Sequence, residues 1–180
     1  MSRLLETIKV TEGRLQNIPF HNHRMMRSVE VLLGLSKTFK LEDFILIPDY
    51  ARSGIFKCRI EYEKEITKIE FLPYTVRPVR SLKLVECNDL EYPLKFTDRT
   101  ILNELADGRG DCDDILIIKN GMVTDTSYSN VVFMDLKGKW ITPSTYLLAG
   151  TRRESLLKSG TILESSVSRH DIHTYSMVKL

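Results

Sequence analysis

The sequence has few cysteines and no long apolar run. Its three cysteines, Cys58, Cys87 and Cys112, are odd in number and lack the Cys-x-x-Cys spacing of redox and zinc motifs. Reduced thiols are the simplest account, and they are typical of cytoplasmic proteins. No apolar run approaches the roughly 20 residues that span a bilayer, and the N-terminus lacks the apolar core of a signal peptide. We therefore predict a soluble cytoplasmic protein with no membrane partner.

Strong net charge and several familiar motifs are also missing. The formal net charge of +2 is too small to indicate nucleic acid or an anionic membrane as a partner, although a local basic pocket for an anionic ligand remains open. There is no Gly-x-Ser-x-Gly motif, no Gly-rich phosphate loop ending in Lys-Ser/Thr, and no dinucleotide fingerprint. The histidine pairs His21/His23 and His170/His173 have no acid cluster nearby, so we predict no metal site.

The first part of the chain is predicted to be an α+β unit built on an antiparallel sheet. Leu4–Val10 should form a strand, Glu12-Gly13 a turn, and Leu15–Ile18 a second strand. A helix should follow, capped by Asn22 and with Arg24 in its first turn. Its apolar face comprises Met25, Met26, Val29, Leu32 and Leu33. A cation in a first turn opposes the helix dipole. An anionic partner would account for Arg24, and a solvated surface arginine is the alternative.

The sheet of this unit continues beyond a broken helical stretch at Leu41–Ala51, which Pro48 interrupts. Apolar and charged residues alternate along Ile55–Glu63, as expected for a strand with one solvated face, and Ile66–Phe71 returns beside it. The two prolines of Pro73–Pro78 disfavour both helix and central strand. They predict a linker and hence two domains, 1–76 and 77–180.

The second domain should contain a helix, a hairpin and further strands. Ser81–Glu86 opens it as a strand, and Asn120-Gly121 is a strong hairpin signal after the apolar strand Ile115–Ile118. Val131–Met134 should continue the returning strand, and Thr161–Val167 should form a last strand. Two further elements are a strand at Trp140–Thr142 and a helix from Gly150-Thr151 to Gly160. The helix before the hairpin should end at Gly108, with one apolar face: Ile101, Leu102, Leu105 and Ala106.

Lys95 and Asp125 are the candidate chemical groups. Lys95 lies between Leu94 and Phe96. In a pocket its ammonium would lose hydration and its pKa would fall, which favours a Schiff base. The alternative is a lysine at a strand edge. Asp125 lies among apolar and hydroxylic residues, where a buried carboxylate needs a partner. A pyridinium nitrogen would serve, and a hydrogen-bonded turn residue is the alternative.

Gly150-Thr151 is a weaker candidate. The pair opens a predicted helix after a strand and a loop. Backbone N–H groups at a helix start, with the threonine hydroxyl, can hold a phosphate. Many helices begin this way, so the pattern indicates a phosphate site only in combination with other signals.

The order of these segments resembles the class IV, fold-type IV pyridoxal-phosphate enzymes, which include branched-chain and D-amino-acid aminotransferases and aminodeoxychorismate lyases. Leu5–Val10 is similar to the family's Phe-Glu-Thr-Ile-Arg-Val strand, and His21–Arg24 matches its His-x-x-Arg. Lys95 followed by Asp98-Arg99 matches the Schiff-base lysine and its Asn-Arg. Gly121–Asn130 looks like the Gly-x-Val-x-Glu-x-x-x-x-Asn segment. The last motif, Thr-Pro…Leu-x-Gly-x-Thr-Arg, is matched by Thr142-Pro143, Leu147, Gly150, Thr151 and Arg152.

The resemblance implies a pyridoxal 5'-phosphate enzyme with Lys95 as the catalytic, Schiff-base residue. It implies a fold in two domains, a small N-terminal α+β domain and a barrel-like C-terminal domain, in a homodimer. The substrate would be an amino acid or 2-oxo acid, in transamination or in aminodeoxychorismate lyase-type release of pyruvate. The residues implied to bind the cofactor are Arg24, Arg99, Asp125, Asn130, Leu147, Gly150 and Thr151.

Three features depart from the family pattern. The acid Asp125 is one methylene shorter than the usual glutamate, and the spacing between Arg24 and Lys95 is compressed. The family also continues past the position of Leu180 with a segment that completes the phosphate and substrate site. These departures leave a second hypothesis open, a non-catalytic scaffold with a role in assembly.

Overall fold

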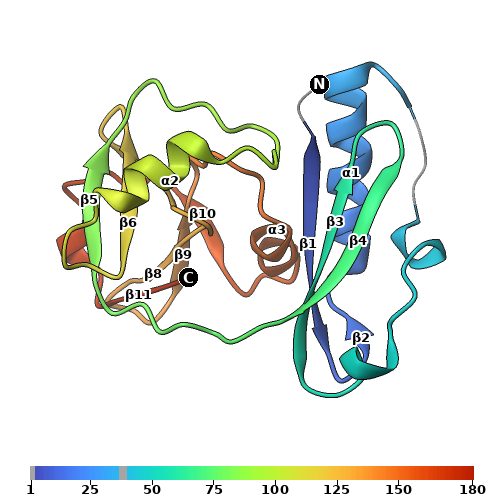
Figure 1. Ribbon diagram of the computed structural model, residues 1–180. Helices are drawn as coiled ribbons and strands as arrows, with labels where there is room; N and C mark the ends of the chain where they lie inside the picture. The colour runs from blue at the N-terminus through green and yellow to red at the C-terminus, as the bar shows by residue number, and fades with distance from the viewer. Residues whose placement is uncertain (1–2, 37–39) are drawn as a thin grey trace. The chain divides into compact units, whose positions relative to one another are not determined.

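The computed structural model describes residues 3–36 and 40–180, which fold into two compact units (Figure 1). The first unit extends to Arg77 and also includes Leu94–Asp98. The second comprises Pro78–Pro93 and Arg99–Leu180. The segment that carries Lys95 therefore groups with the first unit, and the division into domains 1–76 and 77–180 stays a prediction. No helix among the described residues is long and apolar enough to cross a membrane.

The first unit contains a four-stranded antiparallel sheet in the order β2-β1-β3-β4 (Figure 1). Its strands are β1 (Leu4–Thr11), β2 (Arg14–Leu15), β3 (Ile55–Tyr62) and β4 (Ile66–Pro73). Alternating apolar residues of β1 and β3, such as Ile8 and Cys58, are buried in a core that Met25 and Val29 of helix α1 share. The opposite face of the sheet carries the polar residues, as the alternation along β3 predicts.

Helix α1 (Ile18–Leu33) begins earlier than the sequence predicts. Its N-cap position is Asn17, and Pro19 in the first turn favours this start because its φ is already helical. The prediction that Asn22 caps the helix is wrong, and so is the first-turn position of Arg24. The predicted strand over Leu15–Ile18 is reduced to β2 for the same reason. The Asn22 amide instead donates to Glu42 and accepts the Leu41 N–H.

Two connections complete the first unit. The predicted broken helical stretch consists of two short 3₁₀ turns, η1 (Leu41–Asp43) and η2 (Asp49–Ala51). The segment Leu94–Asp98 runs along the edge of β1, with Phe96 opposite Leu4. Hydrogen bonds from the Leu5 N–H to the Lys95 carbonyl and from the Thr97 N–H to the Arg3 carbonyl, 2.8 and 2.9 Å, flank this pair.

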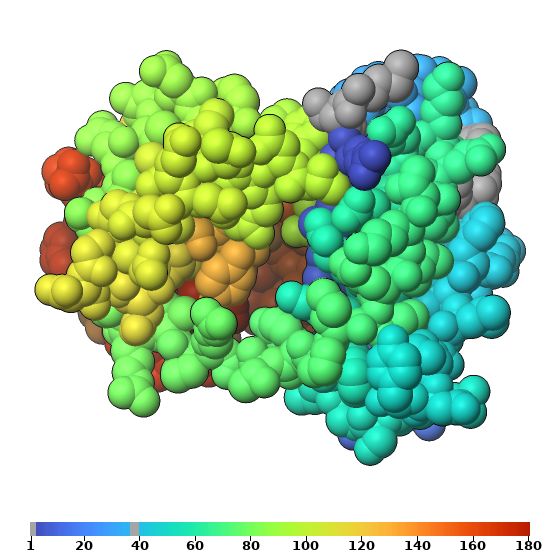
Figure 2. All heavy atoms as spheres, in the orientation of Figure 1, coloured from blue at the N-terminus to red at the C-terminus, as the bar shows by residue number. Residues whose placement is uncertain are grey.

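The second unit contains a three-stranded sheet in the order β5-β6-β7. Strand β5 (Leu82–Glu86) is parallel to β6 (Asp114–Lys119), which forms a hairpin with β7 (Met122–Thr126). The hairpin prediction is confirmed, since Asn120 and Gly121 both have positive φ, 50° and 75°. Helix α2 (Thr100–Asp107) ends at Gly108 as predicted. Its atoms, yellow-green in Figure 2, lie at the surface on one side, and Leu102 faces the core.

A second sheet of this unit has the order β10-β9-β8-β11. Its strands are β8 (Val132–Met134), β9 (Trp140–Pro143), β10 (Leu163–Ser165) and β11 (Met177–Lys179), with helix α3 (Thr151–Lys158) and the turn η3 (Ile172–Thr174) between them. The prediction that residues 131–134 continue β7 is wrong, because a turn at Ser127–Asn130 breaks the strand and β8 joins another sheet. The predicted strand at Thr161–Val167 is shorter than expected. The barrel-like arrangement stays a prediction.

Candidate functional site

Asp125 is the best-defined candidate in the second unit. Its carboxylate is buried near the end of β7. One oxygen, Oδ2, accepts the N–H groups of Leu147 and Leu148 at 3.1 and 3.0 Å. The other, Oδ1, accepts the side-chain amide of Asn130 at 2.7 Å. Three neutral donors thus hold one buried acid in a single orientation.

The raised pKa of Asp125 indicates that the protein compensates the negative charge of this carboxylate only in part. Burial raises it from 3.8 to about 6. The hydrogen bonds from Leu148, Asn130 and Leu147 and the charge of Arg153 act in the opposite direction but do not outweigh burial. A carboxylate in this position can accept one further donor, because an ionised carboxylate has about four acceptor sites. A cationic donor would stabilise its ionised form most.

Local chain geometry explains how Asn130 reaches Asp125. The hairpin at Asn120-Gly121 brings β7 back beside β6. The chain then turns, with the Thr126 N–H donating to the Ser129 carbonyl at 2.8 Å, and this turn places Asn130 opposite Asp125. The Asn130 amide also donates to the Leu148 carbonyl at 2.9 Å, which ties the turn to the loop before α3.

The side chain of Asn130 lies so close to the backbone at position 150 that only glycine fits there. A Cβ atom at this position would lie 1.8 Å from Oδ1 of Asn130 and 3.0 Å from its Cγ. No side chain fits there without displacing Asn130. The backbone of Gly150 has φ −76°, so space is the reason for glycine at this position, and conformation is not. Gly150 precedes α3, whose first residue, Thr151, is buried.

Arg153 is a residue that the sequence reasoning missed. Arg152 is exposed, but the side chain of Arg153 is only 8% exposed. Its Nη2 donates to the Pro143 carbonyl at 2.9 Å and pairs with Glu164. Its guanidinium stacks on Tyr146, 4.5 Å from the ring centroid. The sequence does not indicate which of Arg152 and Arg153 is buried, because the α3 segment has no clear apolar face.

Arg99 lies beside the same turn of the second unit. Its Nη2 donates to the Ser127 carbonyl at 2.5 Å. Its Nε is buried and has no hydrogen-bond partner among the described residues. Among residues 3–36 and 40–180, no ion pair joins Arg99 to an acid. Arg99 is therefore a cation close to the Asp125 hairpin, although it does not bind Asp125 itself.

In the first unit, Arg24 is bound to a buried acid. The carboxylate of Glu6 in β1 accepts hydrogen bonds from Nε and Nη2 of Arg24, at 2.8 and 2.5 Å. Nδ1 of His21 lies 2.6 Å from the same carboxylate. Burial by itself raises the pKa of Glu6, but the charge and hydrogen bonds of Arg24 and the hydrogen bond and charge of His21 outweigh it and lower the pKa to about 2. The guanidinium of Arg24 is thus oriented by a permanent negative charge.

Lys95 lies at the edge of β1, opposite Leu5. Its neighbours Leu94 and Phe96 pack into the core with α1. The Phe96 N–H donates to the Leu94 carbonyl at 2.9 Å, which makes a tight turn centred on Lys95. Since both flanking side chains are taken up by the core on the α1 side, we infer that Lys95 is directed away from it, to the side of Leu5. Arg24 reaches Glu6 on the α1 side. The candidate residues therefore form two sets, with Arg24 and Lys95 in the first unit and the remaining six in the second.

Comparison with known proteins identifies the class. The family model for amino-transferase class IV matches residues 94–178. An uncharacterized protein of Haemophilus influenzae is 41% identical, over 100% of this chain and 96% of its own length. A candidate aminodeoxychorismate lyase of Schizosaccharomyces pombe is 31% identical, over 91% of this chain and 76% of its own. The chain belongs to the class IV aminotransferase and aminodeoxychorismate lyase family.

Solved structures agree on the fold. The crystal structure of a candidate 4-amino-4-deoxychorismate lyase from Haemophilus somnus superposes with a TM-score of 0.91, at 34% identity, over 100% of this chain and 95% of that one. A candidate amino-acid aminotransferase from Mesorhizobium loti shares the fold at 18% identity, with a TM-score of 0.78. The superposition covers 99% of this chain and 93% of that one. The α+β fold of fold-type IV aminotransferases, expected from the sequence motifs, is confirmed.

Proposed function

We propose that this chain is a pyridoxal 5'-phosphate enzyme that acts on an amino-acid-like substrate. The observation that carries the proposal is the carboxylate of Asp125, buried and held by Asn130 and two backbone N–H groups. Its raised pKa and its remaining acceptor site suit a protonated ring nitrogen. A pyridinium would supply the positive charge that the three neutral donors do not.

The residues present fit this cofactor at its ring and at its phosphate. The bound cofactor would supply an electron sink for negative charge at the substrate Cα. Asp125 would keep the ring nitrogen protonated, and Leu147 would pack on the ring. Lys95 would bind the cofactor covalently and then, as a free amine, hold and move the proton at the substrate Cα. Its flanking residues Leu94 and Phe96 anchor the segment in the core of the first unit.

The phosphate would be held mainly by Gly150 and Thr151 at the start of α3, since the backbone N–H groups of a helix start can bind an anion. Arg24 would add a charge, although its pair with Glu6 neutralises part of it. Arg99 would contribute a second cation on the side of the Ser127 turn.

Two reactions share this machinery. The names of two relatives, at 31% and 34% identity, favour an aminodeoxychorismate lyase over an aminotransferase. The test is product analysis: pyruvate released from aminodeoxychorismate supports the lyase, and exchange of the amino group with 2-oxo acids supports the aminotransferase. We further propose that the chain is a homodimer with a barrel-like second domain, as the family likeness implies. Light scattering after size exclusion measures the first of these.

The central experiment is spectroscopic. Purified protein mixed with pyridoxal phosphate should develop a visible absorption band, and borohydride should abolish it while fixing the cofactor to the peptide that contains Lys95. The variant Lys95→Ala should show neither effect, while Lys119→Ala, which removes a lysine outside the site, should behave like the unmodified protein. Labelling that persists in Lys95→Ala would refute the assignment. A folded protein that shows no band at any cofactor concentration would favour the non-catalytic scaffold.

A further inference from the structure

Two lysines lie opposite each other on neighbouring strands of the first unit's sheet. The antiparallel register places Lys9 of β1 directly opposite Lys57 of β3. Directly opposite side chains share a face of the sheet, and this face is the one without α1, because the adjacent Ile8 and Cys58 are buried in the core. Like charges in such a position destabilise a sheet. The pair is therefore unfavourable unless something else compensates it.

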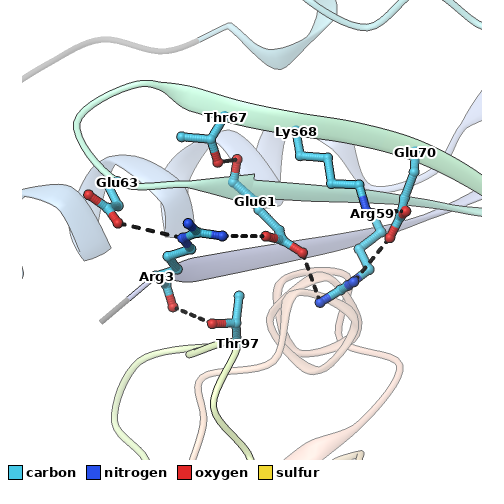
Figure 3. A network of polar contacts seen from close by, with 8 residues as sticks. All are labelled: Arg3, Arg59, Glu61, Glu63, Thr67, Lys68, Glu70 and Thr97. Atoms are coloured by element: carbon cyan, nitrogen blue, oxygen red, sulfur yellow. Dashed lines mark hydrogen bonds and ion pairs between the residues drawn. The ribbon is translucent and has the colours of Figure 1, made fainter. Parts of the chain in front are cut away.

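Six other charged residues on this unit form a network in which acids and bases are paired. Figure 3 shows Arg59 between Glu61 and Glu70, at 3.1 and 3.0 Å, with Lys68 bound to Glu70 at 2.6 Å. Arg3 lies 3.7 Å from Glu61 and 3.8 Å from Glu63. These three acids are thus paired with three bases.

Lys9 and Lys57 stand outside this network. Across residues 3–36 and 40–180, no ion pair joins either lysine to an acid. Their same-face neighbours along the two strands include no acid: Thr7, Thr11, Ile55 and Arg59. Two positive charges therefore lie together at one end of the face, and neither has an ion-pair partner in the described part of the chain; the nearest acid across the sheet, Glu70, is already paired with Arg59 and Lys68.

Lys95 is directed to this same face. It lies opposite Leu5, and Lys9 follows Leu5 by four residues, about 14 Å along the strand at roughly 3.4 Å per residue. Thr7 lies between them and is partly buried. Long lysine side chains can approach each other over such a distance with a small ligand between them. The face thus carries Lys95 at one end and the pair Lys9 and Lys57 at the other.

We propose that Lys9 and Lys57 bind a carboxylate of the substrate remote from its reacting amino group, so that the enzyme favours amino-acid-like substrates with a second carboxylate. The inference rests on the proposed function. A carboxylate between the two ammonium groups accepts a charge-assisted hydrogen bond from each and removes their repulsion. The hydroxyl of Thr7, on the same face, offers a further donor.

The test uses two acids of equal chain length, glutarate with two carboxylates and pentanoate with one. Backbone amide resonances of the cofactor-free protein are followed by NMR during titration with each acid. Glutarate should shift the amides of Lys9 and Lys57 and bind more tightly than pentanoate. The variants Lys9→Gln and Lys57→Gln should each bind glutarate about five- to tenfold more weakly. The matched control is Lys68→Gln, which removes one charge from the same face and should leave glutarate affinity unchanged.

A second arm tests the role in substrate selection. With cofactor bound, loss of the visible band is followed on addition of racemic glutamate or racemic norvaline. In Lys9→Gln the apparent KM for glutamate should rise about five- to tenfold, and that for norvaline should stay the same. The inference is overturned if glutarate affinity is the same in all four proteins, or if Lys68→Gln loses as much as Lys9→Gln. If glutarate binds at Lys9 but the protein never forms the cofactor band, the proposed function is refuted. The substrate role of Lys9 and Lys57 is then refuted as well, and the two lysines are only an anion-binding site.

Discussion

The raised pKa of Asp125 predicts a specific pH dependence of stability. In the unfolded chain this carboxyl titrates near 3.8, and in the cofactor-free folded protein near 6. Between these values the folded state holds a proton that the unfolded state has lost, so the free energy of unfolding falls as pH rises. Each unit of pKa corresponds to about 1.4 kcal/mol, so the loss between pH 3.8 and about 6 should be about 3 kcal/mol.

The assay is urea unfolding at a series of pH values, compared between the natural chain and Asp125→Asn. Other carboxyl groups also titrate, and Glu6 contributes with the opposite sign between about pH 2 and 4.5. These contributions cancel in the difference between the two proteins. The difference should therefore change by about 3 kcal/mol over the window and be flat above it. Parallel pH profiles of the two proteins would refute the inference that burial of Asp125 is incompletely compensated.

Two further predictions concern packing and charge. Gly150→Ala should lower the free energy of unfolding by about 1–3 kcal/mol, since its Cβ has no space; Gly108→Ala, where the nearest atom would be 3.3 Å away, should cost less in the same urea assay. Glu6→Ala should cost about 3–5 kcal/mol, because it leaves the buried Arg24 without its acid. In contrast, Glu70→Ala on the exposed face should cost about 1 kcal/mol or less. Equal losses in the two glutamate variants would contradict the argument from burial.

The sequence predicts the elements that depend on local signals. The alternation along β3, the Asn120-Gly121 hairpin and the end of α2 at Gly108 are each determined by residues a few positions apart, and the structure confirms all three. The start of α1 was missed because Asn22 looks like a cap. Pro19 lies three positions earlier and already fits a first turn.

The parts of the site that depend on distant residues could not be predicted. The donors to Asp125 from Leu147 and Leu148 are backbone N–H groups, which carry no sequence signal. The pairing of Arg24 with Glu6 joins positions 18 residues apart across a helix and a strand. The motif comparison located both residues but assigned Arg24 only to a phosphate. Side-chain contacts of this kind follow from tertiary packing, which neither periodicity nor spacing encodes.

Glu6 and Asp125, two buried acids of this chain, have opposite pKa shifts because their hydrogen-bond partners differ in charge. Glu6 and Asp125 are both almost inaccessible to water, and burial taken by itself would raise the pKa of each carboxyl group. Glu6 is paired with the guanidinium of Arg24 and with His21, and its pKa falls to about 2. Asp125 has hydrogen bonds of similar length but from neutral groups, and its pKa rises to about 6. Glu6 thus has a cation bound to its carboxylate, whereas no cation among the described residues donates a hydrogen bond to Asp125 and the charge of Arg153 offsets its burial only in part, so a cationic ligand would stabilise ionised Asp125 most.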